Sequence, residues 1–168
     1  MDQAFLPVAV IPVYNHGEAV GAVAANVRSH GLRCILVDDG SSAECAAVLD
    51  ALAQAPDVTL VRLAVNQGKG GAMMAGLRAA AAAGHSHALQ IDADGQHDAG
   101  DIPRFLAHAA AQPQAVICGT PVYDESCRRF GWSPAMRRTS GCGSIRCRCR
   151  SATPCAAFAS TRSRRSCA

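Results

Sequence analysis

The sequence contains no run of about 18 or more apolar residues, which excludes a membrane-spanning helix within it. Its first residues hold no basic segment followed by an apolar stretch, so a secretory signal peptide is not expected. Paired Cys-x-x-Cys motifs are missing among the 9 cysteines, which argues against a structural zinc site. These absences predict a cytoplasmic protein whose thiols stay reduced.

Acidic residues are absent from the last part of the sequence. Residues 1–125 hold 13 acidic and six basic residues, whereas residues 126–168 hold ten arginines and six of the nine cysteines. The overall net charge of +3 averages two unlike segments, so it does not indicate binding to nucleic acid. We expect a folded domain over residues 1–125 and an aberrant, disordered, Arg- and Cys-rich tail over residues 126–168.

Short apolar runs alternate with segments of helical composition along residues 1–125. The runs are nearly continuous in apolar residues, which is typical of strands buried on both faces of a parallel sheet. The predicted strands are Val8–Val13, Cys34–Val37, Val58–Leu63, Ala88–Ile91 and Ala115–Cys118, and the predicted helices are Glu18–Ser29, Ser42–Gln54, Gly71–Ala83 and Asp101–Ala111. This alternation predicts an α/β fold with an open, mostly parallel sheet and helices on both faces.

Polar motifs follow the first two predicted strands, at the edge of the sheet where open α/β folds bind ligands. Tyr14 could stack on a nucleobase, or it could belong to an ordinary turn in which Asn15 caps the next helix. Asp38 and Asp39 could bind ribose hydroxyls, or they could serve only the turn and the dipole of the following helix.

The segment Asn66–Gly71 follows the third predicted strand and is rich in glycine. Glycines let a backbone approach a phosphate, a helix N-terminus attracts anions, and Lys69, the only lysine of the chain, adds a positive charge. The segment is neither a Walker A motif nor the Gly-x-Gly-x-x-Gly of dinucleotide-binding folds. This argues against an ordinary NTPase and against a dinucleotide-dependent oxidoreductase.

The segment Asp92–His97, which reads Asp-Ala-Asp-Gly-Gln-His, follows the fourth predicted strand. Two carboxylates one residue apart can point at one hard cation, and Mg²⁺ or Mn²⁺ takes its remaining ligands from waters and substrate phosphates. The same pattern also occurs in solvated turns. After the three preceding strand-end motifs, however, it indicates a site for a divalent metal that carries a diphosphate.

The four motifs in this order resemble the family 2 glycosyltransferases of GT-A fold, in particular their dolichol-phosphate mannose synthase-like branch. The resemblance runs from about Val8 to about Ser126 and implies a Rossmann-like domain that binds a nucleotide-diphospho-sugar. One departure is His16-Gly17, where many relatives have acids. The resemblance implies that the nucleotide-sugar is held by Pro12, Tyr14, Glu18, Asp38, Asp39, Asn66, Lys69 and Asp92, and the metal by Asp92, Asp94 and Gln96.

The resemblance is lost in the tail, where relatives have a segment like Met-Cys-Gly-Phe-Arg-Val-Tyr-Pro-Leu. When residues 154–163 are read from a frame that starts one nucleotide earlier, the genetic code allows this segment with only the wobble bases chosen freely. We therefore interpret residues 127–168 as the product of a frameshift. The acceptor-side groups of relatives would then be missing.

The resemblance implies an enzyme that uses Mg²⁺ or Mn²⁺ and a GDP- or UDP-sugar. The intact form would transfer the sugar, with inversion, to a polyprenyl phosphate or another lipid-linked hydroxyl at the inner face of the membrane, by peripheral contact. We expect the 168-residue chain to be weakly active or inactive. The alternatives are a non-catalytic remnant or nucleotide-sugar-binding module, and a nucleotidyltransferase, although the latter usually has a Gly-rich loop after its first strand.

Overall fold

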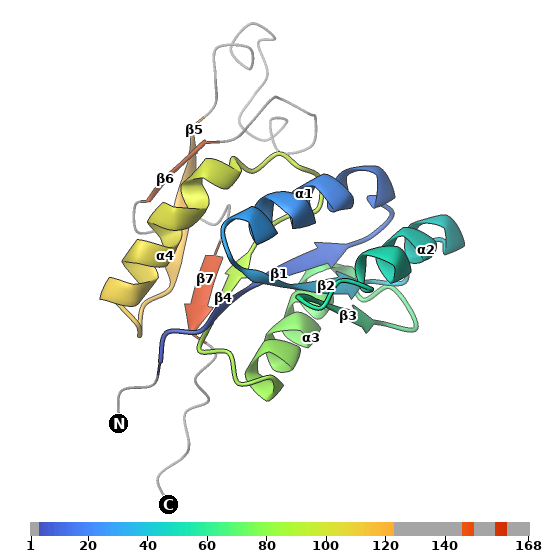
Figure 1. Ribbon diagram of the computed structural model, residues 1–168, viewed down its shortest axis with the longest axis horizontal. Coiled ribbons are helices and arrows are strands. Elements are labelled where there is room, and N and C mark those ends of the chain that lie inside the picture. Colours follow the sequence, from blue (N-terminus) through green and yellow to red (C-terminus); the bar gives the residue numbers. More distant parts are fainter. Residues whose placement is uncertain (1–3, 123–145, 150–156, 161–168) are drawn as a thin grey trace, which may run out of the picture.

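The computed structural model of the protein describes residues 4–122, 146–149 and 157–160 (Figure 1). The elements in chain order are β1 (Pro7–Val13), α1 (Gly17–Ser29), β2 (Arg33–Asp38), α2 (Ala43–Leu52), β3 (Val58–Arg62), α3 (Gly68–Ala82), β4 (His87–Gln90), the short 3₁₀ helix η1 (Ala99–Asp101), α4 (Ile102–Ala111), β5 (Ile117–Val122), β6 (Arg146–Cys149) and β7 (Ala157–Ser160). Among the helices of these ranges, none combines the length and the apolar character that crossing a membrane requires.

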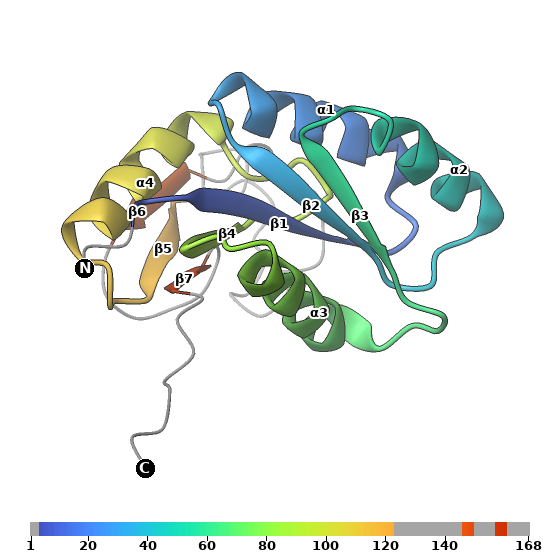
Figure 2. The same ribbon diagram turned by 60° about the horizontal axis from the view of Figure 1, so that its bottom comes forward.

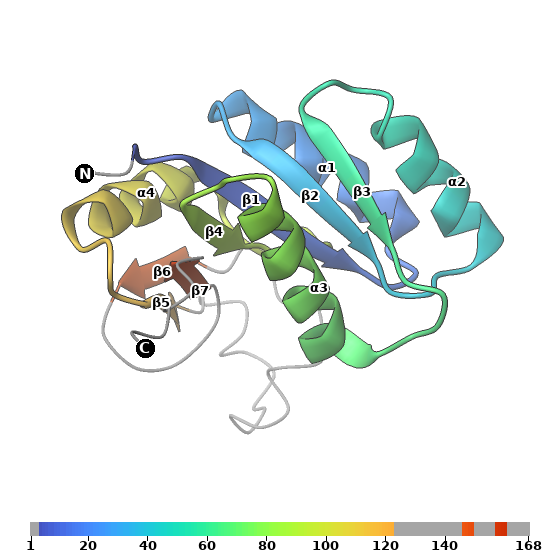
Figure 3. The same ribbon diagram turned by 90° about the horizontal axis from the view of Figure 1, so that it is seen from below.

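The strands form one mixed sheet in the order β3-β2-β1-β4-β7-β5-β6. The first four strands of the chain pair in parallel, and β7 lies antiparallel between β4 and β5. Helices α1, α2 and α4 cover one face of the sheet, and α3 covers the other (Figure 2). Seen from below, α3 lies on the near side of the sheet (Figure 3). The predicted α/β fold, with an open and mostly parallel sheet between helices, is confirmed.

The central strands are buried on both faces. In β1, Val8 and Val10 pack in the cluster that includes α3, whereas Ile11 and Val13 pack in the cluster formed with α1, α2 and α4. All four side chains are at most 1% exposed. Each buried Val or Ile stabilises the fold by about 1.5–3 kcal/mol, which explains why these strands are apolar at nearly every position.

Helix α3 lies unusually close to the sheet at Gly76. A Cβ atom at this position would overlap Cγ1 of Val10 and would come within 2.9 Å of Cγ2 of Val37. The absence of a side chain therefore sets the distance between helix and sheet.

The helix α3 begins three residues earlier than expected, at Gly68 instead of Gly71. Three glycines in its first turn lower the intrinsic helix propensity, which is why the sequence pattern did not include them. The tail also differs from the expected irregular backbone, because β6 and β7 pair with β5. Main-chain pairing needs no particular side-chain pattern, so such segments can still pair with β4 and β5. The other predictions for the tail lie outside the described residues.

Candidate functional site

A cleft of about 460 Å³ opens where the strand-end motifs meet, at the carboxyl edge of the parallel strands. Its lining consists of Pro12, Val13, Tyr14, His16, Asp39, Asn66, Gly68, Lys69, Ala72, Asp92, Ala93 and Asp94. Seven of the ten residues predicted for the site are therefore brought together. Among the described residues, Glu18, Asp38 and Gln96 do not line this cleft. His16 lines the cleft as well, although the sequence analysis identified it only as a departure from the family pattern.

The turn after β1 is held by Asn15, which has a left-handed backbone with φ of 57°. The backbone N–H of Ser42 donates to Asn15 Oδ1 at 2.8 Å, and the N–H of Asn15 donates to Ser41 Oγ at 3.2 Å. Asn15 thus ties two loops together, while His16 takes the N-cap position of α1. The neighbouring Tyr14 is 50% exposed at the cleft, so its ring is available for stacking.

Asp38 has a structural role at the end of β2. Its Oδ1 accepts a hydrogen bond from the N–H of Ser41 at 2.9 Å, and its Oδ2 accepts one from Arg62 Nε at 2.9 Å. Burial raises the pKa of Asp38, but the hydrogen bonds from Ser41 and Arg62 outweigh it and leave the pKa below its usual value. These contacts favour the interpretation in which Asp38 stabilises the turn and the sheet over the one in which it binds ribose hydroxyls.

Asp39 is also buried, yet it lines the cleft. Its Oδ1 accepts a hydrogen bond from the N–H of Gln67 at 2.7 Å, which holds the loop before α3. The adjacent Gly40 has φ of 72°, and a Cβ atom there would lie 2.7 Å from the backbone N of Asn66. Only glycine fits this close approach, so Asp39 and Asn66 are placed side by side by the backbone itself.

The first turn of α3 presents positive charge to the cleft. Asn66 Oδ1 accepts a hydrogen bond from the N–H of Gly68 at 3.0 Å, immediately before the helix. Lys69 extends from this turn, and its Nζ lies 2.7 Å from Asp92 Oδ2. A helix N-terminus combined with a lysine ammonium is well suited to an anionic group such as a phosphate.

The carboxylate of Asp92 is surrounded by hydrogen-bond donors. In addition to Lys69, His97 Nε2 lies 3.5 Å from Oδ2, and Gln90 Nε2 donates to Oδ1 at 3.3 Å. Burial raises the pKa of Asp92, but hydrogen bonds and positive charge from His97 and Lys69 prevail and hold it well below its usual range. Asp92 is therefore an anion at neutral pH.

Asp94 lies on the same side of the loop and lines the same cleft as Asp92. Its Oδ1 accepts a hydrogen bond from the N–H of Gln96 at 3.0 Å, across Gly95, which has φ of 74°. Two carboxylates are hard oxygen ligands, but among the described residues no group of three or more His, Cys, Asp or Glu is arranged to hold a metal. The donor set fits Mg²⁺ or Mn²⁺ only if diphosphate oxygens or waters complete the coordination.

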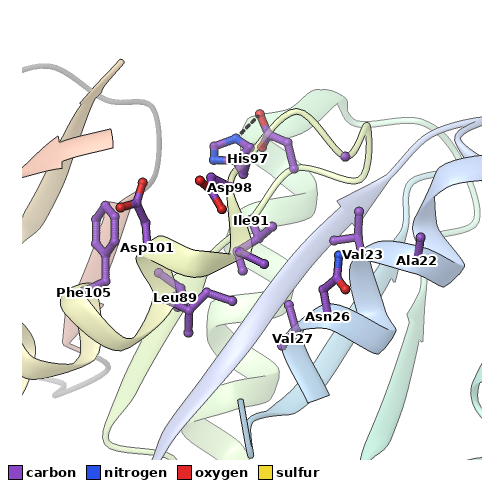
Figure 4. Close-up of a pocket in the computed structure, with 14 residues that line it drawn as sticks. Ala22, Val23, Asn26, Val27, Leu89, Ile91, His97, Asp98, Asp101 and Phe105 are labelled. Carbon is purple, nitrogen blue, oxygen red and sulfur yellow. Dashed lines mark ion pairs between the residues drawn. The ribbon is translucent and has the colours of Figure 1, made fainter. Parts of the chain in front are cut away.

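A second hollow of about 130 Å³ lies beneath the Asp92–His97 loop, between α1 and α4 (Figure 4). Val23, Leu89 and Phe105 give it an apolar lining, and His97 lies at its rim and forms the ion pair with Asp92 drawn as a dashed line. Asp92 borders both cavities.

The fold is that of GT-A glycosyltransferases. The mannosyltransferase PcManGT from Pyrobaculum calidifontis, solved with GDP-Man and Mn²⁺, matches with a TM-score of 0.57 and 22% identity, over 70% of this chain and 35% of that one. S. aureus TarS 1-349 in complex with UDP matches with a TM-score of 0.52 and 15% identity, over 66% of this chain and 34% of that one. Identities this low show the fold alone.

The chain belongs to the family described as Glycosyl transferase family 2, whose model matches residues 8–164. This match continues past Ser126, where the motif resemblance ends. Undecaprenyl-phosphate 4-deoxy-4-formamido-L-arabinose transferase of Sodalis glossinidius is 36% identical over 119 residues, covering 64% of this chain and 34% of that protein. UDP-N-acetylglucosamine--dolichyl-phosphate N-acetylglucosaminyltransferase of Methanococcus voltae is 25% identical over 148 residues, covering 80% and 58%. The chain thus spans about one third of the first relative and 58% of the second, less than two thirds of either.

Proposed function

We propose that the cleft binds a nucleoside diphosphate sugar together with Mg²⁺ or Mn²⁺, and that the domain is the donor-binding part of a glycosyltransferase. One observation carries this proposal. Lys69, the N-terminus of α3 and the carboxylates of Asp92 and Asp94 surround the same cleft. A metal–diphosphate group needs positive charge near its phosphates and oxygen ligands for its cation, and both are supplied here.

The nucleoside would occupy the end of the cleft near β1 and β2. The half-exposed ring of Tyr14 offers a stacking surface beside Pro12, and Asp39 offers carboxylate oxygens to ribose hydroxyls. Because Asp39 is held by the N–H of Gln67 at 2.7 Å, its position is set before the ligand binds. Asp38 is left out of this proposal as a ligand contact, because it does not line the cleft and its hydrogen bonds with Ser41 and Arg62 hold it against the turn and the sheet.

The diphosphate would lie between Lys69 and the acidic pair. Asp92 and Asp94 would hold the metal, with Gln96 as the third ligand that the family resemblance implies. When bound, such a metal supplies Lewis acidity that neutralises charge on the departing nucleoside diphosphate. Lys69 and the backbone N–H groups of the first turn of α3 would stabilise the same negative charge.

The acceptor is proposed to be a polyprenyl phosphate or another lipid-linked hydroxyl, as the names of the two sequence relatives suggest. An ionised phosphate needs no general base, so a single displacement with inversion requires only positioning. Such an acceptor would bring the protein into peripheral contact with a membrane surface. We further propose that residues 127–168 are read out of frame, which would leave transfer weak or absent.

Two experiments test these statements separately. Thermal-shift titration with UDP- and GDP-sugars, with and without Mn²⁺, reports donor binding and identifies the base. Sequencing the gene tests the frameshift: a nucleotide gained or lost near codon 127 relative to close relatives supports it, and an unbroken frame contradicts it. Robust transfer by the 168-residue chain, abolished by Asp94→Ala, would contradict the proposal of weak activity while supporting the donor site.

A further inference from the structure

We propose that Lys69 is an internal counter-ion for Asp92, which keeps this carboxylate from binding a metal until a diphosphate draws the ammonium away. Binding of the metal and binding of the diphosphate would then be coupled through the movement of one side chain. This inference rests on the proposed donor site and deepens it, because it concerns how the site becomes able to accept its ligands.

The geometry around Asp92 is the first support. Lys69 Nζ lies 2.7 Å from Oδ2, His97 Nε2 lies 3.5 Å from the same oxygen, and Gln90 Nε2 lies 3.3 Å from Oδ1. Each oxygen therefore has at least one donor, and Oδ2 faces a full positive charge. A divalent cation approaching Oδ2 would meet repulsion from the ammonium at short range, so the two cations compete for one ligand atom.

The second support is the freedom of Lys69 to move. Its side chain is 58% exposed, whereas that of Asp92 is 24% exposed. Lys69 stands on the first turn of α3, where backbone N–H groups favour a phosphate, and it lines the same cleft. Its flexible four-carbon stem can redirect the ammonium from Asp92 to a phosphate in this cleft without moving the helix.

The third support is the incomplete metal site. Over the part of the chain that the structure describes, no three acidic, histidine or cysteine side chains converge on one point. Asp94 contributes one carboxylate, of which Oδ1 already accepts a hydrogen bond from the N–H of Gln96. A metal alone would gain few ligands and would have to displace Lys69. A metal with a diphosphate gains the phosphate oxygens, and the same phosphates give Lys69 a new anionic partner.

This arrangement predicts reciprocal coupling: a nucleoside diphosphate increases the affinity for Mn²⁺, and Mn²⁺ increases the affinity for the nucleotide by the same factor. Removing the charge of Lys69 should weaken the coupling from both sides. The metal would bind better on its own, because Asp92 is free, and the nucleotide would add less, because one of its cationic contacts is lost.

The test measures Mn²⁺ binding to the whole chain by electron paramagnetic resonance, from the loss of the free-ion signal, with no nucleotide present. Lys69→Met should bind Mn²⁺ at least about fivefold more tightly than the wild type, within the usual range of coupling factors. Lys69→Arg, which keeps a cation beside Asp92, should stay close to the wild type. The double variant Lys69→Met/Asp92→Asn should lose this increase in Mn²⁺ affinity, which would show that Asp92 is the metal ligand.

Equal Mn²⁺ affinity of wild type and Lys69→Met, including no detectable binding by either, would overturn the proposal. Circular dichroism checks that each variant is folded, and Lys69→Gln replaces Lys69→Met if the latter is not. Titrations repeated with UDP and GDP then measure the coupling. If neither nucleotide binds the wild type, the proposed donor site fails, while the nucleotide-free comparison still decides the role of Lys69.

Discussion

The ammonium group of Lys69 lies 2.7 Å from Oδ2 of Asp92 and joins the first turn of α3 to the loop after β4. Ion pairs this exposed stabilise a fold by only about 0–1 kcal/mol, so stability does not explain the contact. Its effect is to place opposite charges at the two sides of one cleft. The proposed recognition of a metal–diphosphate depends on this placement.

Asp92→Asn should abolish the stabilisation of the protein by Mn²⁺ with UDP or GDP, because it removes an anionic ligand and the partner of Lys69. The melting temperature without ligands should also fall at neutral pH, because the fold holds the pKa of Asp92 below its usual range and the ionised carboxylate therefore stabilises the folded state. Differential scanning fluorimetry with and without the ligands measures both effects. Asp50→Asn, an exposed acid of α2 that pairs with Arg62, is the matched control and should keep the ligand-induced shift.

Gly76→Ala should destabilise the protein by about 1–3 kcal/mol, because the new methyl group would press against Val10 and Val37 in a packed core. Gly21→Ala, within α1, is the control: among the described atoms, none lies within 4 Å of the added Cβ. It should stabilise the helix by about 0.5–1 kcal/mol. Urea unfolding curves compare the two, and equal effects would contradict the close packing of α3.

The hollow beneath the Asp92–His97 loop should accept a larger side chain. Val23→Leu, at the lining of the hollow, is expected to raise the free energy of unfolding by about 0.5–2 kcal/mol by filling it. Val20 lies on the same helix and is fully buried. Val20→Leu should therefore lower the free energy of unfolding by about 1–3 kcal/mol. Thermal unfolding of both variants measures the difference, and destabilisation by both would mean that the hollow cannot be filled.

Stability should fall as the pH drops through the range in which Asp38 takes up its proton. The pKa of Asp38 is lower in the folded protein than its ordinary value near 4, so the unfolded chain binds the proton first. The contribution of Asp38 is therefore complete above about pH 4 and is lost progressively below it. Asp38→Asn should flatten this acid dependence, as measured by urea unfolding at several pH values. An unchanged slope would show that Asp38 gains nothing from Ser41 and Arg62.

The fold was accessible to sequence reasoning because the strands are apolar on both faces and the helices end at Gly or Pro. The grouping of Tyr14, Asp39 and Lys69 was also predictable, since parallel strands bring their carboxyl ends to one edge. The different roles of Asp38 and Asp39 were not. They are decided by Arg62 and Gln67, which reach the two side chains only after β2, β3 and α3 have come together.

Hydrogen bonds between loops could not be predicted from the sequence pattern either. One of the two interpretations of this turn made Asn15 the cap of α1, but its side chain accepts a hydrogen bond from the N–H of Ser42, 27 residues further along the chain. His97 was noted only for its place in the Asp-x-Asp loop, and nothing in the spacing predicts its contact with Asp92. The start of α3 could not be predicted because three of its first four residues are glycines, which are poor helix formers.

The central claim is that the cleft binds a nucleoside diphosphate with a divalent metal. Isothermal titration of the folded 168-residue chain with UDP and with GDP, in the presence of Mn²⁺ or of EDTA, tests it most directly. We expect that one of the two nucleotides binds with Mn²⁺, that binding is lost with EDTA, and that Asp94→Ala abolishes it. A folded protein that binds neither nucleotide with Mn²⁺, or that binds a nucleotide equally well with EDTA, would show that the cleft is not a metal–diphosphate site.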